Sequence, residues 1–170
     1  RHTGRTDIPL TPRGEEEARM LRPSLANIEF DSVLCSPLGR ARETCELAGL
    51  AEQAALRDEL LEWDYGDYEG ITSEQIRDER PDWVLWRDGC PGGESPAEIG
   101  ARADVVVSEL LATPGKAIVF AHGHMLRVLA ARWLGLEVAD GRLLALGTGT
   151  LSELGWEHEN RVIRRWNAPA

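Results

Sequence analysis

The chain has 170 residues, enough for one domain that buries a sizeable core without disulfide bonds. Its formal net charge of −10 argues against nucleic acid and anionic membrane surfaces as partners, because both repel an acidic protein. No apolar stretch of about 18 residues is present, so we expect no membrane-spanning helix. The three cysteines, Cys35, Cys45 and Cys90, lack a C-x-x-C spacing, which indicates a reducing, cytoplasmic compartment.

Helices and strands are expected to alternate from the start of the sequence. The first helix is predicted over residues 10–25, where Thr11 can cap the first turn and proline occupies the first helical position. A short strand over 30–35 and a helix over 36–49 should follow, and Ser36 is the expected N-cap of that second helix.

The second half of the chain repeats this alternation. The predicted elements are a helix over 95–112 capped by Ser95, a well-buried strand over 116–121, a helix over 123–135, and strands over 150–157 and 161–167. The last two strands should form a hairpin at the edge of the sheet. Strands followed at once by helices predict an α/β fold with a mostly parallel sheet. No repeat, low-complexity tract or linker divides the chain, so residues 1–170 should form a single domain.

Two predicted strand-to-helix junctions carry side chains suited to an anion. Arg40 lies in the first turns after the strand at 30–35, and His122 stands where the strand at 116–121 becomes a helix. Ligands of parallel sheets bind beyond the carboxyl ends of the strands, and helix N-termini offer free N–H groups. Taken alone, Arg40 is also compatible with a surface arginine and His122 with a core histidine. A metal site that includes His124 is not expected, because no further histidine or cysteine clusters nearby.

A third candidate is Glu62, which follows two leucines and precedes Trp63. A carboxyl group in partly apolar surroundings has a raised pKa and can stay protonated, so it can give a proton to a leaving alkoxide. The alternative is an ordinary solvated glutamate in an acidic loop. A fourth stretch, PGGESP at 91–96, reads on its own only as the start of a helix.

The chain contains five motifs in the order GRTDIPLT, SPLGRA, EWDYGDYEG, GGES and AHGH. Together they resemble the motifs of the histidine phosphatase superfamily. This family contains cofactor-dependent phosphoglycerate mutases, fructose-bisphosphatase domains and broad acid phosphatases. The resemblance covers essentially the whole chain. It implies a three-layer sandwich with a mostly parallel central sheet, and hydrolysis of small phosphomonoesters through a phosphohistidine, without a metal or other cofactor.

The resemblance also implies roles for individual residues. Arg40 matches a phosphate-clamping arginine, Glu62 the proton donor, and His122 a second active-site histidine that is protonated when it holds the phosphoryl group. Substrate or phosphate contacts are implied for Thr3, Gly4, Tyr65 and Gly123. His124 departs from the glycine or asparagine usual at its position, so no role is assigned to it.

The Arg1-His2 pair at the start of the sequence does not match the nucleophile of the family. The nucleophile belongs to an R-H-G motif that ends the first strand, whereas here the Thr3-Gly4 pair matches a later substrate-contacting pair. We therefore expect His2 to carry no chemistry and the nucleophile to lie on a strand outside this sequence. That strand is expected to be central in the sheet, between the strands that end at Cys35 and Ala121.

Other functions within the same family remain open at this point. The mutases have a longer segment before the GGES-like motif, with two adjacent arginines for a substrate carboxylate, whereas Arg77, Arg80 and Arg87 are dispersed here. This favours a phosphatase. A catalytically dead member that binds phosphorylated ligands or a partner protein is a second hypothesis, and a dimerisation module is a weaker third. The sequence also leaves a homodimer open.

Overall fold

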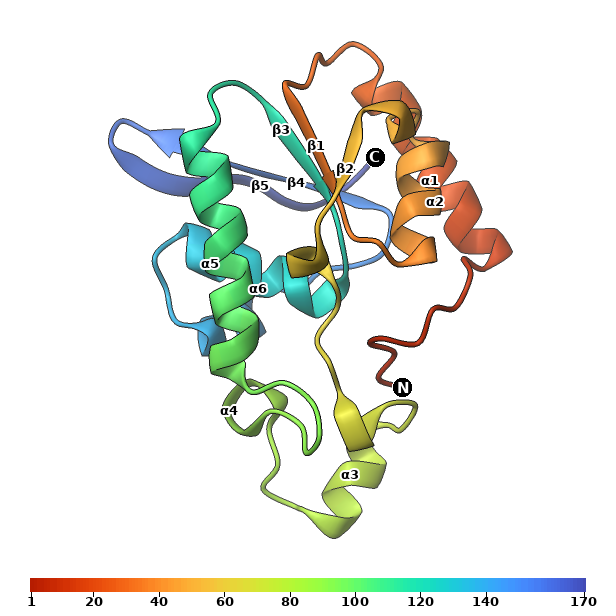
Figure 1. Cartoon of the computed structure of the whole chain (residues 1–170), viewed down its shortest axis with the longest axis vertical. Helices are drawn as coiled ribbons and strands as arrows, with labels where there is room; N and C mark the ends of the chain where they lie inside the picture. The colour runs from red at the N-terminus through yellow and green to blue at the C-terminus, as the bar shows by residue number, and fades with distance from the viewer.

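The computed structural model describes residues 1–170 and shows a three-layer α/β sandwich in which helices cover both faces of a parallel sheet (Figure 1). The sheet contains β1 (Ser32–Cys35), β2 (Ala54–Leu56) and β3 (Ala117–Phe120) in the order β2-β1-β3. One face is covered by α1 (Pro12–Leu25) and α2 (Gly39–Leu47), and the other by α5 (Pro96–Ala112) and α6 (Gly123–Trp133). The α/β fold and the parallel sheet predicted from the sequence are confirmed.

The strand β1 shows how one short sequence supports both layers. Successive side chains of a strand point to opposite faces. Val33 and Cys35 accordingly join the core beneath α1 and α2, whereas Leu34 joins the larger core beneath α5 and α6. All three side chains are almost fully buried, which fits a strand with helices on both faces.

The pairing of β1 with β3 corrects the expected position of a further strand. The two strands are hydrogen-bonded neighbours, with Ser32 opposite Ala117 and Cys35 opposite Phe120, so nothing lies between them. The other edge of β3 has no strand paired to it. In β3 only Phe120 is buried, so the expectation of a well-buried strand is wrong at this edge position.

The C-terminal hairpin also differs from the expectation. The strands β4 (Thr150–Glu157) and β5 (Asn160–Pro169) pair in antiparallel fashion, as predicted. They form a separate two-stranded sheet and do not extend the edge of the central one. Leu154 packs against the larger core, so the hairpin is attached through side chains and not through ladder hydrogen bonds to β3.

Two of the three expected helix caps are present. The Thr11 hydroxyl accepts a hydrogen bond from the Gly14 N–H, and Ser95 forms a capping box with Glu98 at the start of α5. The cap predicted at Ser36 is wrong, because α2 begins only at Gly39 and its N-cap residue makes no side-chain hydrogen bond. The Ser36 hydroxyl contacts a histidine instead.

A long excursion between β2 and α5 covers the carboxyl end of the sheet (Figure 1). It contains α3 (Ser73–Glu79) and α4 (Leu85–Asp88), which the sequence patterns did not predict. Short 3-10 helices lie at Ala51–Gln53, Asp58–Leu60, Gly66–Tyr68 and Val138–Leu143. The N-terminal segment before α1 runs beside this excursion. None of the helices combines the length and apolar character needed to cross a bilayer.

Candidate active site

His122 lies at the centre of the candidate site, two residues after the end of β3 and at the N-cap position of α6. Its side chain is buried, and its Nε2 atom lies 2.7 Å from the Oγ atom of Ser36. Ser36 follows β1 directly, so this hydrogen bond joins the carboxyl ends of the two neighbouring strands. The contact connects residues 86 positions apart, and no local sequence signal indicated it.

Burial and neighbouring charges determine the protonation state of His122 in the protein alone. Burial, followed by the positive charges of Arg40, Arg5 and Arg102, lowers the pKa of His122 from 6.5 to about 3. The imidazole of the protein alone is therefore neutral near pH 7. The protonation expected from the sequence concerns the state in which His122 holds the phosphoryl group, and it stays a prediction. A phosphate dianion placed beside the ring would favour the charged form and raise this pKa again.

Glu62 occupies the amino end of α6. Its Oε1 atom accepts hydrogen bonds from the N–H groups of Trp63 and Met125, both at 2.9 Å, and its Oε2 atom accepts one from His124 N–H at 3.1 Å. The carboxyl group is buried. Burial raises its pKa, and the three N–H donors and Arg40 oppose the rise without cancelling it. A raised carboxyl pKa is the property that a proton donor needs.

Gly123 provides an open donor at the same helix end. Its N–H makes no hydrogen bond within the protein, and the residue is exposed. A Cβ atom at this position would lie 3.9 Å from the Glu62 Oε2 atom, so the open N–H and the buried carboxyl group are close neighbours. Because helix N-termini attract anions, this end of α6 can hold a phosphate oxygen beside Glu62.

Arg40 lies in the first turn of α2 and is half-buried. Its guanidinium group donates to the carbonyl oxygens of Thr6 at 3.0 Å, Gly4 at 2.9 Å and Thr3 at 3.4 Å. No carboxylate pairs with it, so its positive charge remains uncompensated. That charge acts on both His122 and Glu62, as their pKa values indicate.

The two expected contact residues of the N-terminal segment have different surroundings. The Gly4 N–H donates to both carboxylate oxygens of Glu69, at 2.8 and 3.0 Å, so this donor is already occupied. A Cβ atom on Gly4 would lie 2.4 Å from the carbonyl oxygen of Trp63, which explains why only glycine fits. Thr3 is half-buried, and its hydroxyl makes no hydrogen bond within the protein.

The buried Tyr65 and the half-buried His124 form a second pair beside Glu62. The phenol oxygen lies 2.6 Å from the Nδ1 atom of His124. Burial raises the pKa of Tyr65 and lowers the pKa of His124 to about 4, so both groups are neutral near pH 7. The phenol has no other acceptor, so it donates to Nδ1 and the imidazole proton resides on Nε2. The geometry thus gives His124, left without a role by the sequence, a place in the site.

His2 lies against the loop before α3. Its Nδ1 atom lies 2.8 Å from the Ile71 carbonyl oxygen, and its ring centroid is 4.9 Å from that of Tyr65 and 5.8 Å from that of Trp83. Its backbone pairs with Gly70 and Ile71. These contacts give His2 a packing role in the wall of the site.

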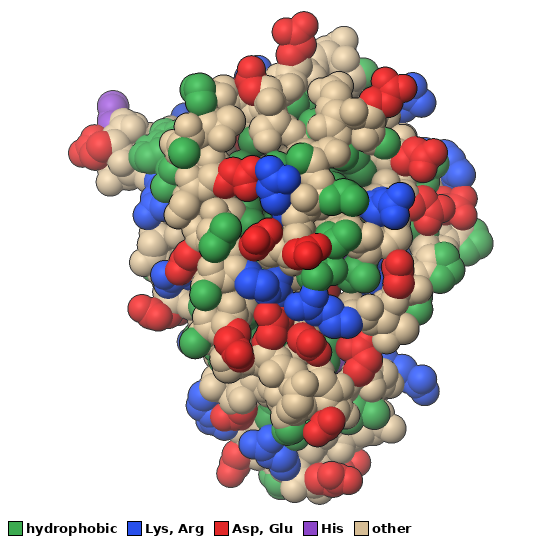
Figure 2. All heavy atoms as spheres, viewed as in Figure 1, with side chains coloured by type: hydrophobic (Ala, Val, Ile, Leu, Met, Phe, Trp, Pro, Cys, Tyr) green, Lys and Arg blue, Asp and Glu red, His purple; other side chains and the backbone are tan.

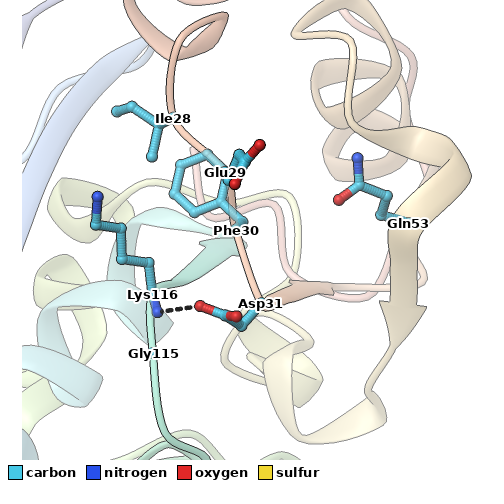
Figure 3. Close-up of a pocket in the computed structure, with 7 residues that line it drawn as sticks. All are labelled: Ile28, Glu29, Phe30, Asp31, Gln53, Gly115 and Lys116. Carbon is cyan, nitrogen blue, oxygen red and sulfur yellow. Dashed lines mark hydrogen bonds between the residues drawn. The ribbon is translucent and has the colours of Figure 1, made fainter.

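A hollow at the opposite end of the sheet is a poorer candidate for the active site. Figure 3 shows its lining residues: Ile28, Glu29, Phe30, Asp31, Gln53, Gly115 and Lys116. They lie at the amino ends of β1 and β3, whereas the groups described above lie at the carboxyl ends. The hydrogen bond drawn there joins the backbone N–H of Lys116 to the Asp31 carboxylate at 2.8 Å.

Charge on the surface is mixed. Acidic and basic side chains are interspersed over the face in Figure 2, without a continuous basic patch there. No three side chains of histidine, cysteine, aspartate or glutamate converge as a group that could hold a metal ion. Arginine side chains lie at the carboxyl end of the sheet, and their planar donor groups suit the oxygens of a phosphate.

The lowered pKa values of His122 and His124 predict a pH-dependent stability. Both histidines take up protons near pH 6.5 when unfolded, but only near pH 3 to 4 when folded. Between these values the unfolded chain binds more protons, so the free energy of unfolding falls as pH falls, by at most about 1.4 kcal/mol per pH unit for each histidine. Urea unfolding in phosphate-free buffer at pH 7.5, 6.0 and 5.0 measures this change in the free energy of unfolding.

His124→Gln should reduce that pH dependence, because the amide can still accept from Tyr65 but does not titrate. His158→Asn, in the exposed turn of the hairpin, is the matched control. If wild type and His124→Gln lose stability equally between pH 7.5 and 5.0, His124 is not held neutral in the folded protein.

Comparison with known proteins places this geometry in a family. The family model described as histidine phosphatase superfamily (branch 1) matches residues 1–169. An acid phosphatase of Mycobacterium tuberculosis is 41% identical over 169 residues, which cover 96% of this chain and 82% of that protein. The sedoheptulose 1,7-bisphosphatase of Saccharomyces cerevisiae is 38% identical over 81% of this chain and 62% of its own length.

Comparison with solved structures supports the same family. The solved structure of an open reading frame product of Mycobacterium tuberculosis superposes with a TM-score of 0.94 at 38% identity, over 99% of this chain and 89% of that one. The motifs at the carboxyl end of the sheet, the family model and the superposition agree over nearly the whole chain, and the chain belongs to branch 1 of the histidine phosphatase superfamily.

Proposed function

We propose that this protein hydrolyses small phosphomonoesters through a phosphohistidine intermediate and needs no metal ion. The observation that carries the proposal is the amino end of α6, where the open N–H of Gly123 lies beside the buried carboxyl group of Glu62. The charge of Arg40 acts on the same place. This arrangement offers donors to phosphate oxygens and a proton to the oxygen that leaves.

The reaction proceeds in two steps. A histidine nitrogen attacks the phosphorus atom in line, the bond to the ester oxygen breaks, and Glu62 gives that oxygen its proton. Arg40, His122 and the Gly123 N–H stabilise the charge on the three equatorial oxygens. Water then attacks the phosphohistidine while the Glu62 carboxylate takes its proton, which releases inorganic phosphate and restores the histidine.

We infer that the attacking histidine is not among the histidines of the site. One ring nitrogen of each is already engaged: Nε2 of His122 lies near the Ser36 hydroxyl, Nδ1 of His124 near the Tyr65 hydroxyl, and Nδ1 of His2 near the Ile71 carbonyl oxygen. The free edge of β3 can accept one more parallel strand, and the carboxyl end of such a strand would lie next to His122. We infer that a segment upstream of Arg1 forms this strand and supplies the nucleophile.

Phosphatase activity is favoured over mutase activity by the arginines before α5. Arg77 donates to the Trp83 carbonyl, Arg80 to the Tyr68 hydroxyl, and Arg87 to Asp88. Each is engaged within its own segment, and together they form no pair for a substrate carboxylate. The names of the acid phosphatase and bisphosphatase relatives support the same assignment.

The proposed setting is a reducing cytoplasm and the proposed partner a small phosphorylated metabolite. All three cysteines are free and buried, which suits a compartment in which thiols stay reduced. The catalytically dead alternative within this family requires that no histidine reach the phosphorus atom, and the labelling experiment below separates it from the enzyme.

The position of the nucleophile is tested by acid-labile labelling. The protein extended upstream of Arg1 should form a phosphohistidine from a ³²P-labelled phosphomonoester in excess chelator, and His2→Ala should label equally well. The 170-residue chain should remain unlabelled. Labelling of the 170-residue chain that disappears in His2→Ala would identify His2 as the nucleophile, and labelling that requires Mg²⁺ or Zn²⁺ would contradict the metal-free mechanism.

The role of Glu62 is tested by the basicity of the leaving group. Glu62→Gln should lower kcat in the extended protein by about 10²–10⁴-fold for an alkyl phosphate, whose leaving oxygen needs a proton. The loss should be far smaller for 4-nitrophenyl phosphate, because nitrophenolate leaves without one. Equal losses on the two esters would mean that Glu62 positions the substrate and donates no proton. Glu59→Gln, at a half-buried neighbouring glutamate, is the control.

A further inference from the structure

The segment that carries Glu62 has no regular structure of its own. Residues 61–65 connect the 3-10 helices at Asp58–Leu60 and Gly66–Tyr68 and belong to no helix or strand. A proton donor must nevertheless be held to within a fraction of an ångström of the leaving oxygen. The contacts that fix this segment therefore matter for the reaction.

One side of the segment is held by Arg102, which projects from α5. Its Nε and one terminal nitrogen donate to the two carboxylate oxygens of Glu94, at 2.6 and 2.8 Å. Its other terminal nitrogen donates to the carbonyl oxygens of Glu59 at 2.6 Å and Leu61 at 2.9 Å. A longer contact of 3.4 Å reaches the carbonyl oxygen of Glu62 itself.

The other side of the segment is held by Glu94. Its carboxylate accepts a hydrogen bond from the Asp64 N–H at 2.9 Å, and the two residues also pair through Glu94 N–H and the Asp64 carbonyl at 2.9 Å. The indole N–H of Trp63 donates to the Glu94 carbonyl at 3.0 Å. The Arg102–Glu94 pair thus contacts the chain immediately before and immediately after the Glu62 side chain.

The pair is well shielded from water. The side chains of Arg102 and Glu94 are only 18% and 14% exposed. A two-pronged arginine–carboxylate contact in such surroundings has a defined geometry, which an exposed ion pair lacks. Arg5 also lies near Glu94, but its closest nitrogen is 3.7 Å from the carboxylate and makes no hydrogen bond to it. Arg5 therefore does not duplicate the contact that Arg102 makes.

We propose that Arg102 and Glu94 are positioning residues for the proton donor, and that their ion pair keeps the Glu62 carboxyl group at the amino end of α6. This inference rests on the proposed role of Glu62 as general acid. A lysine at position 102 keeps the charge, but a single ammonium group cannot serve two carboxylate oxygens and two carbonyl oxygens in these directions. The loop would shift, and the proton would no longer be aimed at the leaving oxygen.

The test compares Arg102→Lys and Glu94→Gln in the extended protein with a matched control. Arg132→Lys is that control, because Arg132 holds Asp104 of α5 by the same two-pronged contact, at 2.7 and 3.0 Å, without contacting residues 59–64. Each variant is assayed for kcat and KM with an alkyl phosphate and with 4-nitrophenyl phosphate, and its kcat is measured against pH.

Arg102→Lys and Glu94→Gln should each lower kcat for the alkyl phosphate by about tenfold to a hundredfold, because a displacement of about 1 Å costs that much. The kcat for 4-nitrophenyl phosphate should change by less than about threefold, and KM for both esters should change little. The basic limb of the kcat profile, which reports a protonated Glu62, should also shift. Arg132→Lys should leave all of these unchanged.

A loss of equal size on both esters, or no loss on either, would overturn the proposal and leave the ion pair with a general structural role. Glu94→Gln provides the same comparison if Arg102→Lys does not fold. The Glu62→Gln variant separates the two claims. If it is selective for the alkyl ester and the pair variants are not, only the positioning proposal fails, whereas an unselective Glu62→Gln overturns both.

Discussion

The amino end of α6 is the feature on which the rest of the site depends. Two of its first N–H groups, those of His124 and Met125, bind the carboxylate of Glu62, and a third, that of Gly123, remains open. One helix end therefore holds a buried acid and leaves one donor open for an anion. The N–H groups oppose the rise in the carboxyl pKa that burial causes, without cancelling it.

The parallel order of the sheet brings the other groups to this helix end. Because β1 and β3 are neighbours, Ser36 and His122 meet where both strands end, and α2 then delivers Arg40 from the same side. The excursion between β2 and α5 adds Glu62, held by Arg102 and Glu94. Arg40 and His122 thus lie on or beside regular elements of the fold, whereas Glu62, the proposed proton donor, lies on a loop that needs its own support.

Local sequence signals predicted the parts of the fold that local forces determine. Thr11 and Ser95 marked two helix starts correctly, since a cap is formed by residues close in sequence. Ser36 was misread as a cap because its partner, His122, is distant in sequence. The order of the strands, the contacts of Arg102, and the low pKa of His122 likewise depend on tertiary packing. The motifs pointed to Arg40, Glu62 and His122, but their mutual geometry required the structure.

The central claim, that the open N–H of Gly123 receives a phosphate oxygen, is tested most directly by nuclear magnetic resonance. Inorganic phosphate is titrated into ¹⁵N-labelled protein at pH 7, and the amide resonance of Gly123 and the ring resonances of His122 are followed. We expect a saturable shift of the Gly123 amide resonance and protonation of His122 in the same concentration range, and both should be weaker in Arg40→Ala. A Gly123 amide that does not move while phosphate binds at Lys116 or elsewhere would contradict it.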